Sequence, residues 1–310
     1  MTNAMKKHII TNLFRCMAVS ALALGAAACS DWTETEAVEQ QVQRPADQDP
    51  AFWAEYTAAL REYKQSEHFL TYARLYNSPT PSASEKDYMR CLPDSLDIVS
   101  LTNADNFSRF DAEDMVTMHE KGTRVLYQVD YAARKAEFAD AAALKTYLNG
   151  VIAAVAANGL DGYSFTADPL DAVATATIVA TLSAAKTDDQ LLVYEGNPLF
   201  VAEADRAKLD YVVLDTEATT DITTLKLQVV NATGYAGIAP ERLLLAAAAG
   251  APLYDEEVVE HAAITEMAER VVSLGPLAGL AAYDIDNDYY DVERNYPLLS
   301  DAIQLLNPSK

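Results

Sequence analysis

The stretch GLDGYSFTADP, residues 159–169, predicts a short strand that ends on alternating polar residues. A helix-like segment ends at Gly159, and an apolar strand begins at Leu160. Side chains two positions apart on a strand point to the same face, so Ser164, Thr166 and Asp168 would project together. The stretch therefore predicts one βα unit whose strand carries a candidate site at its carboxyl end.

Segments of the same kind recur along the chain, with helix-like segments between them. The eight strand candidates cover residues 69–77, 96–103, 123–131, 160–168, 190–197, 209–217, 242–250 and 277–286. The clearest helix candidates are residues 136–158 and 256–273, and Gly159 stands where a helix C-cap glycine is expected. Strands that alternate with helices imply parallel βα units, and eight units in about 250 residues is the size of a TIM barrel. We therefore predict a single-domain α/β fold, a (β/α)8 TIM barrel over residues 51–310. A doubly wound open sheet is the alternative, but the sequence has no glycine-rich phosphate turn to support it.

The N-terminus predicts a lipoprotein signal peptide over residues 1–28. Basic residues precede an apolar run from Met17 to Leu24, which is too short to span a bilayer. Small residues then lead to Cys29 in an arrangement that resembles a bacterial lipobox, and the acidic tract after it resembles the surface-export signal of Bacteroidetes lipoproteins. We expect a lipidated Cys29, a flexible tether over residues 29–50 and an anchor in the outer membrane, with the protein exposed at the cell surface. The alternative is an ordinary signal peptide in which Cys29 is incidental.

Composition disfavours several classes of function. The chain has 23 basic and 46 acidic residues and a formal net charge of −23, which disfavours binding to nucleic acid and to anionic membrane surfaces. If Cys16 leaves with the signal peptide and Cys29 is lipidated, Cys91 is left alone, so we expect neither a disulfide nor a cysteine metal cluster. Four scattered histidines without an HExxH motif argue against a zinc hydrolase. We predict no cofactor and no metal.

Polar residues follow most of the predicted strands, at the end of the barrel where the sites of TIM-barrel proteins lie. A sugar-binding site needs many convergent hydrogen-bonding groups, and the candidates are Tyr76, Asn103, Asp130, Thr166, Asp168, Glu195, Asp215, Tyr283 and Asp284. The alternative is that each strand end meets water and is polar for that reason. Tyr283, Tyr289 and Tyr290 would form an aromatic platform at this end of the barrel or, alternatively, pack in the barrel and cover its rim.

Residues 161–168 resemble the signature strand of glycoside hydrolase family 18, the chitinase and endo-β-N-acetylglucosaminidase family. The family pattern is Asp-x-x-Asp-x-Asp-x-Glu on the fourth strand of a (β/α)8 barrel. Asp161 matches the first Asp, whereas Ser164, Thr166 and Asp168 stand in place of the second Asp, the third Asp and the Glu. The segments FWAEYTAALREYKQSEH, LPDSLDIVSLTN and KGTRVLYQVDY resemble the opening helix and the second and third strands of Bacteroidetes lipoproteins that carry this domain. The resemblance spans about residues 50–310 and implies a TIM barrel that handles glycans containing N-acetylglucosamine.

The replaced residues are the ones that the family's reaction needs. The resemblance implies that the Glu protonates the glycosidic oxygen and that the Asp before it orients the acetamido group of the substrate, which attacks the anomeric carbon. Thr166 has no charge to stabilise the oxazolinium cation that develops. Asp168 is shorter than Glu by roughly 1.5 Å, and a misplacement of ~1 Å can lower a rate ~100-fold.

We therefore predict a surface-anchored, glycan-binding pseudo-glycosidase that retains glycans of the N-glycan or chitin type without efficient cleavage. The expected partners are an oligosaccharide ligand and outer-membrane proteins of glycan uptake. Two alternatives stay open. One is an active endo-β-N-acetylglucosaminidase with altered acids, in which Asp168 works with Asp215 or Glu217. The other is a structural or assembly subunit of a glycan-uptake system.

Overall fold

The computed structural model describes residues 44–308, and the chain divides into two compact units, Met1–Pro50 and Ala51–Lys310. The predicted signal peptide, Cys29 and residues 30–43 of the predicted tether lie outside the described residues. Near the end of the predicted tether the structure has a short helix, α2 (Pro45–Gln48). Among residues 44–308, no helix is long and apolar enough to cross a membrane.

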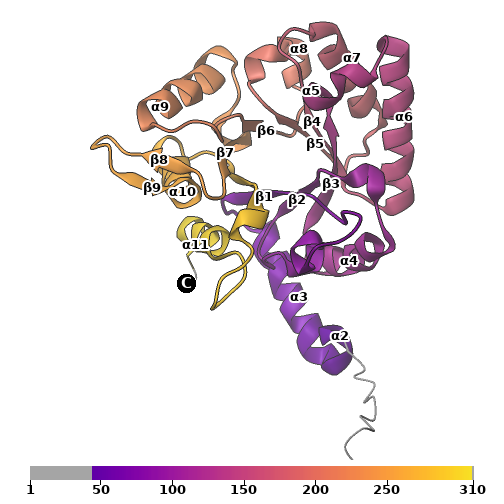
Figure 1. Cartoon of the computed structure of the whole chain (residues 1–310), viewed down its shortest axis with the longest axis vertical. Coiled ribbons are helices and arrows are strands. Elements are labelled where there is room, and N and C mark those ends of the chain that lie inside the picture. The colour runs from indigo at the N-terminus through magenta and orange to yellow at the C-terminus, as the bar shows by residue number, and fades with distance from the viewer. Residues whose placement is uncertain (1–43, 309–310) are drawn as a thin grey trace, which may run out of the picture. The chain divides into compact units, whose positions relative to one another are not determined.

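The second unit is built on a closed barrel of eight parallel strands (Figure 1), as the sequence predicts. The strands are β1 (Leu70–Leu75), β2 (Ile98–Leu101), β3 (Arg124–Asp130), β4 (Gly162–Thr166), β5 (Leu191–Glu195), β6 (Tyr211–Leu214), β7 (Leu243–Ala248) and β10 (Gly279–Tyr283). They follow one another around the barrel in chain order, and β10 closes the ring by pairing with β1. All eight predicted strands are therefore confirmed, with ends one to three residues shorter, and the open sheet is excluded.

Helices connect the strands around the outside of the barrel (Figure 1). The longer connecting helices are α4 (Arg109–Glu120), α6 (Ala141–Asn158), α7 (Ala172–Ala185), α9 (Ile222–Val230) and α10 (Ala263–Ser273). Helix α3 (Pro50–Gln65) precedes β1, and α11 (Pro297–Leu306) follows β10. Two helices have a single turn: α5 (Tyr131–Arg134) follows β3, and α8 (Glu203–Arg206) precedes β6. Each connection returns the chain to the same end of the barrel, so all eight strands present their carboxyl ends together.

Two helix boundaries differ from the predictions for local reasons. Helix α6 starts at Ala141 and not at residue 136, because the Asp140 carboxylate accepts hydrogen bonds from the first free amides, Ala142 and Ala143 N–H. The same helix ends as predicted, with Gly159 in the left-handed conformation at φ 67°. Helix α10 starts at Ala263 and not at 256, because an antiparallel hairpin of β8 (Pro252–Tyr254) and β9 (Glu260–Ala262) precedes it.

The barrel strands divide the core into two parts. On β1, Tyr72 belongs to the interior cluster with Leu126, Val213 and Leu244, whereas its neighbour Ala73 belongs to the cluster that packs against the helices. This alternation places every second residue of a strand inside the barrel. The interior is apolar in its middle layer and becomes polar toward the carboxyl ends of the strands, where the candidate site lies.

Candidate functional site

The small polar residues of β4 bond to residues on and after other strands of the barrel. Ser164 is fully buried, and its Oγ lies 2.7 Å from Oγ of Ser100 on β2. Thr166 Oγ1 donates to Asp130 Oδ1 at 2.7 Å and accepts from the Ala132 amide at 3.1 Å. Asp130 Oδ1 also accepts from the Ala133 amide at the start of α5. Thr166 and Asp130, two of the predicted site residues, therefore lie together at the carboxyl end of the barrel.

Asp168 stands at the position of the family's acid but is held as a carboxylate. Its Oδ2 lies 2.9 Å from Lys135 Nζ, and its Oδ1 accepts from the Leu170 amide at 2.7 Å. The hydrogen bond from Lys135 and the one from the Leu170 amide lower the pKa of Asp168 below its usual value. A general acid needs the opposite shift, because it must carry a proton near neutral pH.

Asp161 lies at the other end of β4 and has a structural role. Its Oδ2 accepts from the Val125 amide at 2.8 Å and from His119 Nε2 at 3.1 Å. These bonds join the start of β4 to β3 and α4. The one Asp that matches the family pattern is therefore not at the carboxyl end of the barrel.

Glu195, the last residue of β5, is the centre of a buried polar cluster at that end. Only 4% of the residue is exposed. Tyr72 Oη donates to its Oε1 at 2.8 Å, Tyr283 Oη donates to its Oε2 at 3.0 Å, and Gln128 Nε2 lies 3.1 Å from Oε1. Arg74 Nε lies 2.5 Å from Oε2 and completes an ion pair. Below, the name Glu195 cluster means Tyr72, Arg74, Ser100, Gln128, Ser164, Glu195 and Tyr283.

The Glu195 carboxyl is ionised despite its burial. Burial alone would raise its pKa, but the charge of Arg74 and the surrounding hydrogen bonds, including that of Tyr72, outweigh burial and lower the pKa. The Arg74 guanidinium is in turn stacked on the ring of Tyr283, with its Cζ 3.6 Å from the ring centroid. The cluster therefore contains a fixed, hydrogen-bonded ion pair inside the barrel.

A second pair of carboxyls follows β6. Asp215 is exposed and Glu217 is half-buried. Burial first, and then the neighbouring charge of Asp215, raise the pKa of Glu217 to about 7, although Arg74 opposes this shift. Glu217 is therefore a carboxyl that holds a proton for part of the time at neutral pH, as a catalytic acid must.

The remaining predicted site residues divide between structural and exposed positions. Asn103 Nδ2 donates to the Asn77 carbonyl at 2.8 Å, and the Asn103 amide donates to Asn77 Oδ1 at 3.1 Å, so this pair joins two loops. Tyr76, just after β1, is 61% exposed. Asp284 is exposed too, in the left-handed conformation at φ 51°.

The tyrosines predicted as an aromatic platform are not together. Tyr283 is buried in the Glu195 cluster, and Tyr289 packs edge-on against Tyr296 with ring centroids 5.3 Å apart. Tyr290 is exposed. Of the two interpretations, packing in the barrel holds for Tyr283 and packing at the rim for Tyr289.

Four members of the Glu195 cluster were not predicted from the sequence. They are Tyr72, Arg74, Ser100 and Gln128, and all lie inside strands, before the polar strand ends. A signal for them is present: each is a polar or hydroxyl-bearing residue inside a strand that is mostly apolar. Charged residues are rarely buried without a partner, so an arginine in such a strand indicates a buried carboxylate nearby.

A hollow of about 790 Å³ lies at the opposite end, beside the start of β1, and is lined in part by Tyr63, His68, Phe69 and Asn307. Asn307, just after α11, bonds to both backbone groups of Phe69, with Oδ1 accepting at 2.9 Å and Nδ2 donating at 2.8 Å. In TIM barrels this end serves stability, and sites lie at the carboxyl ends of the strands.

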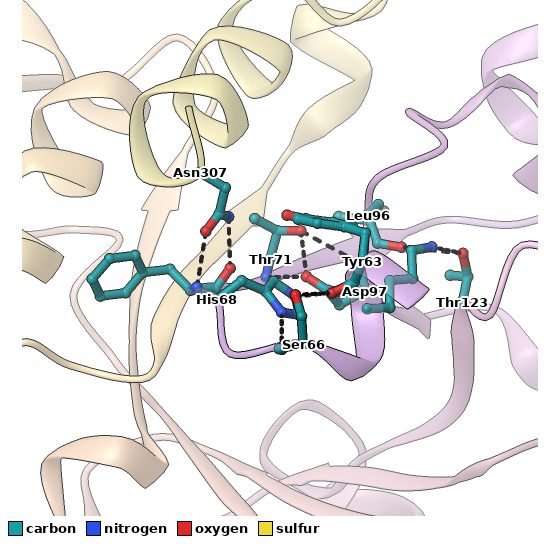
Figure 2. Close-up of polar contacts among 10 residues, drawn as sticks. Tyr63, Ser66, His68, Thr71, Leu96, Asp97, Thr123 and Asn307 are labelled. Carbon is teal, nitrogen blue, oxygen red and sulfur yellow. Dashed lines mark hydrogen bonds and ion pairs between the residues drawn. The ribbon is translucent and has the colours of Figure 1, made fainter. Parts of the chain in front are cut away.

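The polar residues near this hollow bond to one another (Figure 2). The buried Asp97 carboxylate accepts from the amide and the hydroxyl of Thr71 and from His68 Nε2. Lys64 Nζ donates to the Leu96 carbonyl and to Thr123 Oγ1, each at 2.7 Å. These contacts tie α3 to the first three strands, so we place the functional site at the carboxyl end and not here.

Comparison with known proteins agrees with this architecture. A model of glycoside hydrolase family 18, BT1044-like, matches residues 33–150. That match covers β1 to β3 and ends before β4, so it includes Arg74 and Asp130 but not the segment Asp161–Asp168. No curated protein matches the sequence.

Several solved structures match most of the chain. A selenomethionine variant of BT1044 has a TM-score of 0.69 at 16% identity, covering 86% of this chain and 96% of its own. A mutant endo-β-N-acetylglucosaminidase from Cordyceps militaris, in complex with fucosyl-N-acetylglucosamine-Asn, has a TM-score of 0.61 at 17% identity and covers 81% and 95%. A chitinase from Bacteroides thetaiotaomicron has a TM-score of 0.60 at 12% identity and covers 78% and 97%. At these identities the structural matches show the fold. The family model adds that residues 33–150 are similar to glycoside hydrolase family 18.

Proposed function

We propose that this protein is a surface-anchored pseudo-glycosidase that binds glycans containing N-acetylglucosamine and does not cleave them efficiently. The observation that carries the proposal is the set of residues that stand in the signature positions on β4 and just after it. Asp168, in the acid's position, is paired with Lys135 and has a lowered pKa, so it does not hold a proton at neutral pH. Thr166 and Ser164 supply no negative charge for a cationic intermediate.

The carboxyl end of the barrel keeps groups that suit sugar binding. Thr166 and Asp130 lie together there, Tyr76 is exposed, and the Arg74 side chain is 25% exposed. Hydroxyl and amide groups of sugars need such donors, acceptors and aromatic faces. The related Cordyceps militaris enzyme, as a mutant, was solved with fucosyl-N-acetylglucosamine-Asn, which is why we propose a ligand of this class.

The cellular setting is part of the proposal. Acylation of Cys29 would anchor the protein in the outer membrane, and the polar segment up to residue 43 would hold the barrel away from the surface. A glycan retained there would be presented to neighbouring outer-membrane proteins of glycan uptake. The strongly negative charge of the chain keeps it from nucleic acid and from anionic lipid.

One observation favours a second candidate, an active endo-β-N-acetylglucosaminidase with a relocated acid. Burial and the neighbouring charge of Asp215 raise the pKa of Glu217 to about 7, which is the direction that a general acid requires. In this candidate Glu217 protonates the glycosidic oxygen while the acetamido group of the substrate attacks the anomeric carbon.

The test is a panel of N-glycans and chitin oligosaccharides, with binding and released reducing ends measured on the same purified protein. We expect saturable binding and no product, with Asp168→Ala and Glu217→Gln changing affinity only. Product that Glu217→Gln or Asp168→Ala abolishes would favour the second candidate. A protein that binds none of the panel would contradict the proposal and leave a structural subunit as the better account.

A further inference from the structure

Arg74 is the charged donor of the Glu195 cluster, and part of its hydrogen-bonding capacity is unused. Its Nε bonds to Glu195 Oε2. Within residues 44–308, neither terminal nitrogen of its guanidinium has a hydrogen-bond partner, and neither is shut off from solvent. The guanidinium therefore offers N–H donors to a ligand at the carboxyl end of the barrel.

The orientation of Arg74 is fixed by two contacts. The ion pair with Glu195 holds Nε, and the ring of Tyr283 supports the guanidinium plane with Cζ 3.6 Å from its centroid. Glu195 in turn is held by Tyr72 and Gln128, which come from two other strands. A donor held this way loses little conformational entropy when a ligand arrives.

The surroundings limit what the ligand can be. A guanidinium has donors and no acceptor, so it needs an oxygen acceptor on the ligand. A free amine offers no such acceptor and would be repelled by the positive charge. An anionic sugar would meet the exposed Asp215 and the large negative charge of the chain. The acceptor that remains is neutral. Sugar hydroxyls are neutral acceptors too, but an acetamido carbonyl is the stronger acceptor and is the group that distinguishes N-acetylated sugars from other sugars.

We propose that Arg74 is the residue that selects N-acetylated sugars, by donating hydrogen bonds to an acetamido carbonyl of the bound glycan, and that Glu195 and Tyr283 are its positioning residues. This inference rests on the proposed glycan-binding function and deepens it. In this proposal the acetamido group is recognised by residues of β1, β5 and β10, and not by the altered signature residues of β4.

The test compares binding of chitotetraose with binding of its de-N-acetylated form, which carries an amine in place of each acetamido group. We expect wild type to prefer the acetylated form. Arg74→Lys should weaken binding of that form about 10-fold to 100-fold, because charge-assisted hydrogen bonds with fork geometry are lost. Glu195→Gln should lower the preference through misplacement of Arg74, and Glu195→Asp should restore part of it.

Two controls keep the result interpretable. Arg124→Gln removes an arginine from the amino-terminal end of β3, where it bonds to the Asp189 carbonyl, and should leave binding unchanged. Arg74→Gln with Glu195→Gln removes both charges together, so a folded double variant that still prefers the acetylated sugar would overturn the inference. Unchanged binding by Arg74→Lys would also overturn it while the proposed function stands. If wild type binds neither sugar, the proposed function falls and this inference falls with it.

Discussion

Replacing Arg74 should show how much the buried ion pair with Glu195 contributes to the free energy of unfolding. In Arg74→Met, the Glu195 carboxylate stays buried without its counter-charge, a situation that typically costs about 3–5 kcal/mol. Tyr72, Gln128 and Tyr283 still donate to Glu195 in that variant, so we expect the lower part of this range, about 3 kcal/mol. For a domain of this size that loss lowers Tm by about 6–12 °C.

The double variant supplies the reference for this prediction. Arg74→Met with Glu195→Leu removes both charges, and we expect it to recover most of the loss, because well-packed apolar replacements of buried ion pairs are often neutral. The assay is urea unfolding followed by circular dichroism on wild type, both single variants and the double variant. An Arg74→Met variant that loses less than about 1 kcal/mol, with additive single effects, would refute the buried-pair interpretation.

The pH dependence gives a second check on the same pair. The pKa of Glu195 is lowered in the folded protein, so its contribution to stability is present above the pKa of the unfolded state and is lost as pH falls through the folded pKa. Without Arg74, burial would instead raise this pKa, and the carboxyl would take up a proton. The difference in stability between wild type and Arg74→Met should therefore shrink as pH is lowered.

Three further predictions concern the rest of the chain. Both ring nitrogens of His68 face acceptors, and the hydrogen bond to Asp97 raises the His68 pKa; stability from this contact should be full below the unfolded pKa of about 6.5 and fall as pH rises through the folded pKa. Thermal unfolding over pH 6–9 checks this, and His68→Gln should flatten the profile. A Cβ at Gly279 would overlap the backbone carbonyl of Leu70 on the neighbouring strand, so Gly279→Ala should fold poorly, and a wild-type melting temperature would contradict this. Cys29→Ala should move the protein from the membrane fraction to the soluble fraction; retention in the membrane would contradict the anchor.

The fold was predictable because local patterns carry most of it. Eight apolar segments bounded by polar residues gave the eight barrel strands, and Gly159 ended α6 where its left-handed conformation is needed. The hairpin of β8 and β9 was missed because two three-residue strands are too short to show a period. The predicted start of α6 was too early because residues 136–140 are apolar enough to continue the helical pattern. The observed start is set by Asp140, whose side chain caps the first amides of the helix.

The site was predictable at the strand ends and not within the strands. Glu195 and Tyr283 were among the candidates, because each ends its strand. Arg74 was not, because it lies inside β1. An arginine there indicates a buried carboxylate, but the sequence does not say which one, and Glu195 lies 121 residues away. The pairing of Asp168 with Lys135 also comes from tertiary structure, since the sequence does not show that α5 and the following turn bring Lys135 to β4.

The central claim is that this barrel binds a glycan at a site that has lost its acid and its charge stabiliser. Product analysis by mass spectrometry tests it most directly, with the same chitin and N-glycan substrates given to wild type and to the triple variant Ser164→Asp, Thr166→Asp, Asp168→Glu. The triple variant restores the family's carboxylates, although burial and mutual repulsion would lower its stability. We predict bound, uncleaved glycan with wild type and detectable cleavage with the triple variant alone. Steady release of product by wild type would contradict the account.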